Sequence, residues 1–387
     1  MKDLKIGVIG ASGRGRLADY AHQPGSGSQL VGAADTSPKA LTGFKEKYGE
    51  NVFLTSDYKE LLANSEIDAV FVSTPDFLHE EQSLAALEAG KAVYLEKPMA
   101  ITVEGCDRIL EMAYKTKSKL YLGHNMRHFP VILKMKELID NDVIGRVQAI
   151  WCRHFISYGG DAYFKDWHSE RELTTGMLLQ KGAHDIDIIH WLAGSYTDRV
   201  IGMGKLSVYN ECHRRSPETE GDSTWSLDNW PPHTQKNLSP KIDIEDHSMI
   251  MMNLENGVQA NYMQCHYTPD AERNYTIIGT KGRIENMGDH GDCQVHAWTQ
   301  RTGRSADIIY DLKKKEGGHG GSDPNIVKEF VNFVRDGIKT NTSPIAARNS
   351  VATGVMGTQS LRDDNIPQVI PKLSKELIDY FENGQVS

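Results

Sequence analysis

The first 123 residues alternate short apolar runs with segments of helical period. The apolar runs lack polar alternation, which is typical of strands covered on both faces. We expect strands at Ile6–Ile9, Leu30–Ala34, Ala69–Ser73, Ala92–Leu95 and Leu120–Gly123. Between them the spacing predicts helices at Pro38–Tyr48, Asp57–Ala63, His79–Ala89 and Val103–Lys115. This order predicts a doubly wound parallel sheet of the α/β class.

A different pattern begins near Val147. Hairpin turns at Asn256-Gly257 and at Gly279-Thr280-Lys281-Gly282 each separate two strand-like runs, which indicates antiparallel pairing. At 387 residues the chain exceeds the usual length of one domain. We therefore predict a parallel-sheet domain over 1–123 and an α+β domain over 124–387.

A polar segment, 210–243, interrupts the second predicted domain. It holds four prolines and two tryptophans and has no period, so we predict a long loop. Loops of such length are usually functional or disordered. Trp225 and Trp230 favour an ordered lid or a subunit contact.

Composition narrows the range of partners. A net charge of −9 without clustered Lys and Arg argues against nucleic-acid or anionic-membrane binding and favours a small molecule. No secretory leader and no membrane-length apolar run is evident, so we expect a cytoplasmic protein. The five cysteines are scattered and odd in number, which favours reduced thiols and no bound metal.

The first predicted strand runs directly into Gly10-Ala11-Ser12-Gly13-Arg14-Gly15, followed by a predicted helix. Residues without a Cβ allow a tight turn and close approach to a pyrophosphate, while a helix N-terminus supplies amide donors. Ser12 stands where the usual pattern has its middle glycine, so a glycine-rich turn without a ligand stays an alternative.

Asp35 ends the next predicted strand, 20 residues after Gly15. A carboxylate there can accept both ribose hydroxyls of an adenosine and would repel a 2′-phosphate, which predicts NAD in preference to NADP. The segment Asp35-Thr36-Ser37-Pro38 also suits an ordinary helix cap, and both roles are compatible.

Several motifs resemble the Gfo/Idh/MocA family of oxidoreductases, over nearly the whole chain. They are Val8-Ile9-Gly10, Asp35, Thr74-Pro75 with His79 following, Ala89-Gly90-Lys91, Glu96-Lys97-Pro98, Gly123-His124-Asn125-Met126-Arg127 and Gly182-Ala183-His184-Asp185-Ile186-Asp187. The resemblance implies a Rossmann domain, a second domain with a large, mostly antiparallel open sheet, and a homodimer or homotetramer. It also implies NAD(P)-dependent oxidation or reduction of sugars and polyols. The cofactor-binding residues it implies are Gly10, Ser12, Gly13, Arg14, Gly15, Asp35, Thr74, Pro75, His79, Glu96, Lys97 and Asn125.

Oxidising a carbinol requires a base that removes a proton from oxygen as hydride leaves carbon. The resemblance makes Lys97 an active-site lysine that assists this proton transfer. Pro98 biases Lys97 toward an extended backbone at the sheet edge. Outside this motif, a lysine at a strand end would be interpreted as a solvated surface residue.

Residues Thr174–Gly194 predict one helix, with threonine at its start and glycine past its end. Its polar arc, either solvated or part of a site, carries Gln180, Lys181, His184, Asp187 and Trp191. The resemblance makes His184 catalytic and Asp187 its neighbour or orienting group. Gln180 replaces the aspartate that the family pattern places four residues before this histidine. Lys181 is then the alternative charged group, as in relatives with Lys-x-x-His.

Aromatic side chains ahead of this helix suit one face of a sugar ring, and equally suit a core or a rim. Together with the resemblance, this predicts a substrate site formed by Lys97, Arg127, Tyr163, Trp167, His168, Gln180, His184 and His319.

The leading hypothesis is an NAD-dependent oxidoreductase acting on a sugar, glycoside or polyol. A glycoside hydrolase that oxidises its substrate transiently and leaves NAD unchanged overall is the first alternative, which Gln180 and Lys181 keep open. A non-catalytic NAD-binding regulator is the second alternative, against which Lys97 and His184 argue.

Overall fold

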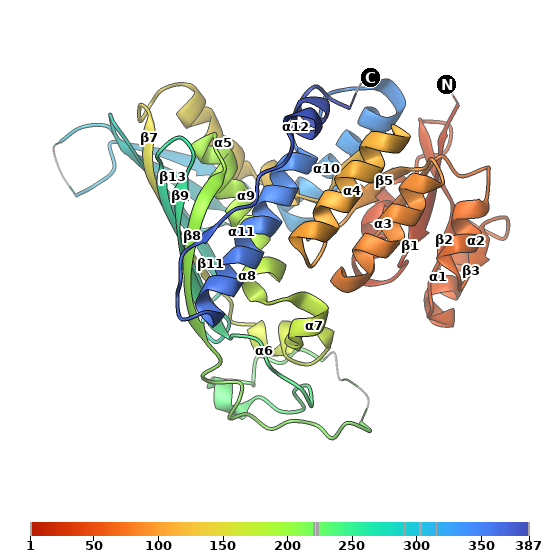
Figure 1. Ribbon diagram of the computed structural model, residues 1–387, viewed down its shortest axis with the longest axis horizontal. Coiled ribbons are helices and arrows are strands. Elements are labelled where there is room, and N and C mark those ends of the chain that lie inside the picture. Colours follow the sequence, from red (N-terminus) through yellow and green to blue (C-terminus); the bar gives the residue numbers. More distant parts are fainter. Residues whose placement is uncertain are drawn as a thin grey trace. The chain divides into compact units, whose positions relative to one another are not determined.

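The computed structural model describes residues 2–219, 221, 224–289, 291–301, 304–314 and 316–385. The chain divides into two compact units. The first unit comprises Met1–His128, Glu316–Arg348 and Lys372–Ser387, and the second comprises Phe129–Lys315 and Asn349–Pro371. Two C-terminal segments thus accompany the N-terminal residues, which differs from a division into 1–123 and 124–387. The helix α11 (Pro344–Arg362) runs from one unit into the other (Figure 1).

A six-stranded parallel sheet forms the centre of the first unit. Its strands are β1 (Leu4–Ile9), β2 (Ser28–Ala34), β3 (Phe53–Thr55), β4 (Ala69–Val72), β5 (Ala92–Leu95) and β6 (Leu120–Leu122). The order β3-β2-β1-β4-β5-β6 is that of a doubly wound dinucleotide-binding sheet, so the predicted α/β class is confirmed. Strand β3 was not predicted, because three residues are too few to show a period.

Four described helices of the first unit agree closely with the predicted ranges: α1 (Pro38–Tyr48), α2 (Tyr58–Ala63), α3 (His79–Glu88) and α4 (Val103–Thr116). The helix predicted after the glycine-rich turn is η1 (Gly13–Ala21). The unit also contains helices that were not predicted: η2 (Asp76–Leu78), η3 (Asn125–His128), α10 (Gly318–Asp336) and α12 (Lys375–Glu382). Side-chain caps define several starts: Ser37 accepts from the Ala40 amide at α1, and Thr102 accepts from the Gly105 amide at α4.

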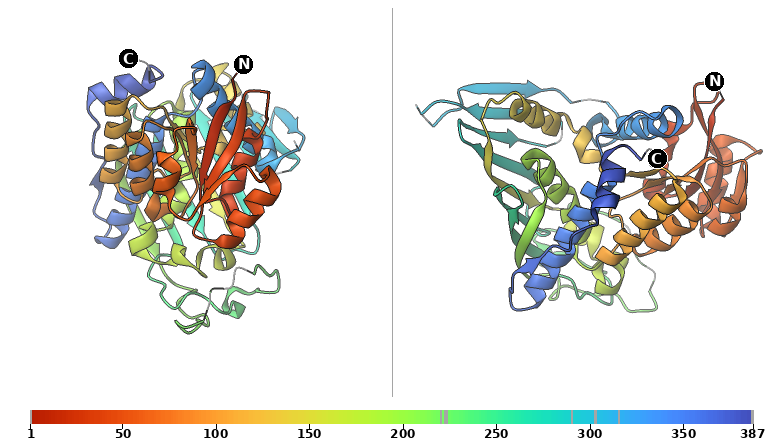
Figure 2. Two further views of the ribbon diagram at one scale, coloured as in Figure 1. Left: turned by 90° about the vertical axis from the view of Figure 1, so that its right-hand side faces the viewer. Right: turned by 45° about the horizontal axis from the view of Figure 1, so that its top comes forward.

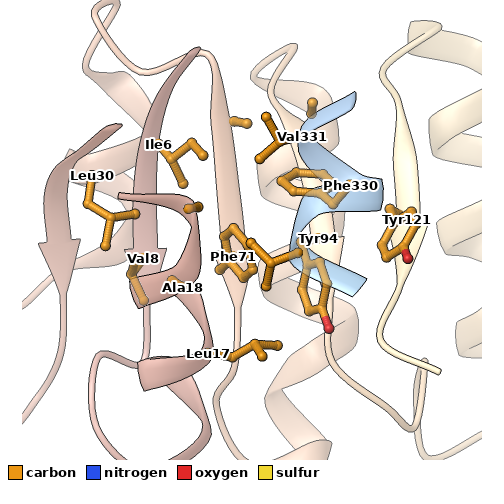
Figure 3. Packing of buried hydrophobic residues seen from close by; sticks show 14 of the residues in the cluster. Ile6, Val8, Leu17, Ala18, Leu30, Phe71, Tyr94, Tyr121, Phe330 and Val331 are labelled. Atoms are coloured by element: carbon orange, nitrogen blue, oxygen red, sulfur yellow. The ribbon is translucent and has the colours of Figure 1, made fainter. Parts of the chain in front are cut away.

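The core of this unit joins the sheet to a helix from far along the chain. Phe71 stacks on Tyr94 with ring centroids 4.4 Å apart, and Phe330 of α10 meets both rings edge-on (Figure 3). Each such aromatic pair contributes about 0.5–1.5 kcal/mol beyond its area burial. The C-terminal segment 316–348 is therefore part of the Rossmann core.

The second unit is built on a mixed sheet of nine strands in the order β14-β13-β12-β11-β7-β10-β9-β8-β15. They are β7 (Val147–Phe155), β8 (Thr197–Lys205), β9 (His247–Leu254), β10 (Gln259–Cys265), β11 (Glu272–Gly279), β12 (Arg283–Met287), β13 (Cys293–Trp298), β14 (Ile308–Leu312) and β15 (Gln368–Val369). Only the β7–β10 pair is parallel among the described pairings, so a mostly antiparallel sheet is confirmed. Both predicted hairpin turns join paired neighbours, β9–β10 and β11–β12.

The two faces of this sheet differ in burial. Its helices are α5 (Pro130–Asp140), α6 (Gly159–Tyr163), η4 (Trp167–Ser169), α7 (Arg171–Thr174), α8 (Met177–Gln180), α9 (Gly182–Ala193) and η5 (Pro232–Thr234). Helices α5, α9 and the second part of α11 lie on the same side of the sheet (Figures 1 and 2). Strand β9 alternates buried and exposed residues, and Met249 and Met251 are on its exposed face.

The described residues of the polar segment 210–243 are irregular apart from η5, as the sequence predicts. It is anchored where Cys212, Leu238 and Ile242 pack against Phe164 and Met177 in a buried cluster. Trp225 and Trp230 stay 59% and 47% exposed. Residues 220, 222 and 223 of the segment lie outside the described residues.

No helix among the described residues is both long and apolar enough to cross a membrane.

Candidate active site

The glycine-rich turn lies at the carboxyl end of β1. A Cβ on Gly15 would stand 1.9 Å from the carbonyl oxygen of Gly10, so the turn itself requires glycine there. At Gly13, with φ +52°, a Cβ would meet nothing within 4 Å, which leaves the backbone open to a ligand. The predicted helix after the turn is the 3-10 helix η1 rather than an α-helix. Its small buried residues recur every third position, at Gly15, Ala18 and Ala21, which matches the 3-10 repeat.

Asp35 follows β2 and faces this turn. One carboxylate oxygen accepts a hydrogen bond from the Ala11 amide and the other from the Ser37 amide, both at 2.8 Å. The helix cap itself is Ser37, so Asp35 is a turn residue beside the cap. A carboxylate has about four acceptor positions, which leaves capacity for two ribose hydroxyls.

His79 connects the two loops that carry the family-like motifs. Its Nδ1 lies 2.7 Å from the carbonyl oxygen of Pro98, and its Nε2 lies 2.9 Å from that of Thr74. The side chain is buried, with 1% exposure. His79, which was predicted to bind the cofactor, thus contacts the main chain of the loops at Thr74-Pro75 and Lys97-Pro98.

Arg14 joins the turn to two acidic residues. Its Nε donates to Glu96 at 2.8 Å, and its guanidinium also donates to both oxygens of Asp323 at 3.1 Å. Burial opposes the charge of Arg14, but the negative charges of Glu96 and Asp323 outweigh it and raise the pKa of the guanidinium. The predicted residues Arg14 and Glu96 are thus brought together, and Asp323 was missed.

His319 joins the same cluster through an unusual backbone. Its Nδ1 lies 2.8 Å from Asp323, although its side chain stays 48% exposed. His319, Gly320 and Gly321 have φ values of 49°, 66° and 87°, which interrupt the start of α10. Only the two glycines adopt this conformation at little cost, which is why the sequence has a glycine pair here.

The carboxyl ends of β5 and β6 carry the remaining predicted residues of the first unit. Lys97 follows β5, is partly buried, and has a cis peptide bond to Pro98. Arg127 is 5% exposed and donates to the carbonyl oxygen of Asn341 at 2.6 Å, so part of its guanidinium has a structural role.

Asn125 offers a direct test of fit for a cofactor. The side chain is 4% exposed, and its Oδ1 has no hydrogen-bond partner in the structure as described. A buried unsatisfied amide oxygen costs about 1–3 kcal/mol unless a ligand donor reaches it. Together with the open backbone at Gly13 and the carboxylate of Asp35, this residue fits a dinucleotide.

In the second unit, the predicted helix Thr174–Gly194 is broken into pieces. It comprises the end of α7, then α8 and α9, because Thr175 has φ +63° and Lys181 stands between the last two helices. Gly194 ends α9 in the left-handed conformation, as predicted. The polar arc is not solvated: Gln180 and Asp187 are 5% and 1% exposed. His184 lies in the first turn of α9 and is partly buried.

Lys181 lies in an aromatic environment. Its Nζ is 3.4 Å from the hydroxyl of Tyr158, and 5.6 and 5.3 Å from the ring centroids of Tyr158 and Tyr163. Burial, together with the positive charge of Arg273, lowers the pKa of Lys181 below its usual 10.5. An amine held this way can exchange a proton near neutral pH more readily than a surface lysine.

The predicted aromatic residues lie together near this amine. The Tyr163 ring meets His168 edge-on at 5.4 Å, and His168 stacks on Trp167 with ring centroids 3.7 Å apart. His168 also bonds Asp166 at 2.6 Å. Tyr163, Trp167 and His168 are therefore one cluster beside Lys181, while Tyr158 was missed by sequence reasoning.

A buried charged network, which the sequence analysis did not predict, joins α9 to strands β7 and β11. Asp185 is fully buried, accepts a hydrogen bond from Tyr275, and lies 3.0 Å from Arg273 Nε and 3.1 Å from His154 Nδ1. Burial and the charge of Arg273 lower the pKa of His154 to about 3, so this imidazole is neutral at pH 7. Three strand residues and one helix residue form this network, and no local spacing indicates such a set.

His266 is a further buried residue of this region. Its Nδ1 lies 3.2 Å from the carbonyl oxygen of Asp246, and its ring meets Tyr163 edge-on. Burial lowers its pKa to about 3, and the charge of Lys181 contributes in the same direction. The sequence shows only a histidine after a cysteine, without a motif.

Comparison with known proteins matches two parts of the chain. Residues 4–124 match the model of an oxidoreductase family described as an NAD-binding Rossmann fold, and residues 136–369 match the C-terminal α/β domain of that family. The chain belongs to the Gfo/Idh/MocA oxidoreductase family. The predicted family and NAD-binding domain are thereby confirmed.

Relatives of this oxidoreductase differ in how much of the chain they match. YteT of Bacillus subtilis, classed as an oxidoreductase, is 26% identical over 349 residues, 78% of this chain and 82% of that protein. The inositol 2-dehydrogenase/D-chiro-inositol 3-dehydrogenase of Halalkalibacterium halodurans is 30% identical over 227 residues, 56% of this chain and 62% of that protein. A levoglucosan dehydrogenase solved with NADH and levoglucosan has a TM-score of 0.77 at 18% identity, covering 96% of this chain and 100% of that one, which establishes the fold.

Proposed function

We propose that this oxidoreductase transfers hydride between NAD and a carbinol or carbonyl carbon of a neutral sugar, glycoside or polyol. The observation that carries the proposal is the buried amine of Lys181 beside Tyr158 and Tyr163, at the start of the helix that bears His184. Relatives named for inositol and for 1,5-anhydro-D-fructose support the substrate class.

The first unit supplies the groups for the dinucleotide. The open backbone at Gly13 and the amides of the turn would hold the pyrophosphate, Asp35 would accept from the adenosine ribose, and Asn125 would accept from the carboxamide. NAD, when bound, supplies the hydride acceptor of an oxidation.

Proton transfer is assigned to basic side chains. Lys97 of the first unit is assigned as a base for the substrate hydroxyl. In the second unit, His184 and Lys181 are assigned as further basic groups and Asp187 as their orienting group. Gln180 cannot carry the negative charge that the usual aspartate provides. The lowered pKa of Lys181 supports its role as the compensating base.

The remaining predicted site residues are assigned to substrate contact. Tyr163, Trp167 and His168 present aromatic surface beside Lys181, and the weakly positive C–H edges of a sugar ring favour the negative face of an aromatic ring. Arg127 and His319 offer hydrogen-bond donors to hydroxyl groups.

The proposal also covers the oligomeric state of the protein and its cellular compartment. Trp151, Met249 and Met251 are 60%, 42% and 66% exposed on one face of the nine-stranded sheet, which supports a homodimer or homotetramer formed through that face. All five cysteines are free and buried, which supports a reducing cytoplasmic environment. Light scattering of wild-type protein and of Met251→Asp tests the association, because a buried charge there would dissociate it.

The test of the activity records NADH absorbance and aglycone release together, with NAD and a panel of inositols, aldoses and aryl glycosides. Stoichiometric NADH that is abolished in Lys97→Met and in His184→Ala supports the proposal. Aglycone release without net NADH would instead identify a redox-neutral hydrolase, and NAD binding without turnover of any panel member would favour a regulator.

A further inference from the structure

A pocket lies within the second unit and is lined largely by the irregular segment 210–243. Its volume is about 370 Å³, within the range of roughly 300–1,000 Å³ typical of small-molecule sites. Trp225, Trp230, Tyr158 and Gln235 are among its lining residues.

The aromatic part of the pocket is built around one stacked pair. The ring of Trp225 stacks on that of Tyr158, with centroids 5.3 Å apart and 11° between the planes. Trp225 and Trp230 keep 59% and 47% exposure, so much of both indole rings is available to a ligand. Exposed tryptophans are rare on a monomer surface, and their grouping in one concave pocket indicates binding.

The polar part of the pocket contains an unsatisfied acceptor. Gln235 is 4% exposed, and its Oε1 has no hydrogen-bond partner in the chain as described. The side-chain nitrogen Nε2 of Gln235 packs closely on Gly160. A Cβ added at Gly160 would lie only 2.6 Å from this nitrogen. The free protein already bears the desolvation penalty of this buried oxygen. A ligand hydroxyl that donates a hydrogen bond to it would therefore gain binding free energy.

The charge of the lining selects a neutral ligand. Asp161 is the one ionisable acid among the residues that line the described pocket, and it is paired with Lys165 at 2.8 Å and accepts from Asn229 Nδ2 at 3.2 Å. No lysine or arginine is among the described residues that line the pocket, so these residues offer no counter-charge to a phosphate or a uronate. Aromatic faces combined with Gln, Asn and Asp side chains match a ring with apolar C–H faces and equatorial hydroxyls.

Tyr158 links this pocket to the candidate catalytic amine. Its ring lines the pocket and stacks on Trp225, while its hydroxyl lies 3.4 Å from Lys181 Nζ. A ligand in the pocket and a substrate carbon near Lys181 would thus lie on either side of one tyrosine, a separation suited to adjacent sugar rings.

We infer that the pocket of Tyr158, Trp225, Trp230 and Gln235 is a subsite for a second, neutral sugar ring, so that the substrate is a disaccharide or longer glycoside. The inference rests on the proposed function, because it presumes that the reacting ring lies near Lys181. The binding itself does not require hydride transfer and can be measured separately.

The experiment titrates full-length protein calorimetrically with cellobiose, maltose, lactose and gentiobiose, and with glucose and galactose. At least one disaccharide is expected to bind at least tenfold more tightly than its monosaccharides. Trp225→Ala is expected to raise the Kd of that disaccharide about tenfold, a loss corresponding to one aromatic contact, and to leave monosaccharide binding unchanged. The control is Phe53→Ala, which removes an exposed aromatic ring on β3 of the first unit.

Two results would overturn the inference. Either no disaccharide of the panel binds more tightly than a monosaccharide, or Trp225→Ala binds the disaccharide as tightly as the wild type and Phe53→Ala do. Disaccharide binding that depends on Trp225 without any NADH formation would uphold the subsite and remove the proposed activity. Turnover of the disaccharide with wild-type efficiency in Trp225→Ala would uphold the activity and remove the subsite.

Discussion

Lys181 Nζ lies 3.4 Å from the hydroxyl oxygen of Tyr158, and this contact connects a buried amine to the aromatic surface of the second unit. Burial is the largest influence on the pKa of Lys181 and lowers it, while the nearby hydroxyl acts in the opposite direction. The neutral amine, which is the form that accepts a proton, is therefore populated at lower pH than in a solvated lysine.

Replacing Lys181 by Met is expected to lower kcat about 10²- to 10³-fold, because one positioned base is lost. The oxidation rate of the wild type should rise with pH through an inflection below 10.5, and this inflection should be absent in the variant. Steady-state kinetics from pH 6 to 10 provide the measurement. Lys205→Met, at the exposed end of β8, is the control, and wild-type kcat in Lys181→Met would contradict the assigned role.

Substituting Asn for Asp185 should destabilise the protein by roughly 3–5 kcal/mol, since it leaves the buried guanidinium of Arg273 with Asp289 as its remaining carboxylate. Urea unfolding at pH 7 measures the change. The comparison variant is Asp142→Asn, whose exposed pair with Lys281 contributes at most about 1 kcal/mol. Equal effects of the two substitutions would show that the network does not stabilise the fold.

We expect acid to destabilise the protein, because two buried histidines resist protonation in the folded state. His154 and His266 have folded pKa values of about 3 against an ordinary 6.5, so between these values the unfolded chain binds more protons. Stability therefore falls as pH decreases from 6.5 toward 3.

The readout is the Tm between pH 7 and pH 4 in wild type and in His266→Asn. The amide of Asn retains a donor for the carbonyl of Asp246 but does not titrate, so the Tm of the variant should fall less steeply. A slope identical to that of the wild type would rule out His266 as a source of acid sensitivity.

Asp35→Asn is expected to lower the preference for NAD over NADP about 10- to 100-fold, because the carboxylate that accepts the ribose hydroxyls loses its charge. The ratio of kcat/KM for the two cofactors reports the change. Asp57→Asn is a close control, since Asp57 accepts from the amide two residues on, as Asp35 does, but at the start of α2. An unchanged ratio would show that Asp35 only supports the turn.

The elements of the Rossmann domain could be predicted because the sequence signals that define them lie among neighbouring residues. Unalternated apolar runs, Ser37 and Thr102 at helix starts, and the glycine-rich turn each depend on neighbours in sequence. The predicted helix after the turn is present as the 3-10 helix η1, in which small buried residues recur at every third position.

The candidate site was only partly predictable, because much of it depends on pairing between distant strands. Asp185 meets Arg273 and His154 through the register of β7 and β11, where Arg273 is directly opposite His154. Neither residue belongs to a sequence motif. His319 and Asp323 likewise reach Arg14 only because α10 returns to the N-terminal sheet.

That return of the chain affects how the protein is made. Phe330 fills the centre of the parallel-sheet core, and the side chain of Gln385 bonds both the amide and the carbonyl of Leu120 at the edge strand β6. During synthesis, residues 1–128 leave the ribosome before Phe330 and Gln385 have been made. Their apolar surface therefore stays uncovered until these later segments are synthesised. The parallel sheet is therefore expected to complete its packing only after segment 316–348 and Gln385 have been synthesised.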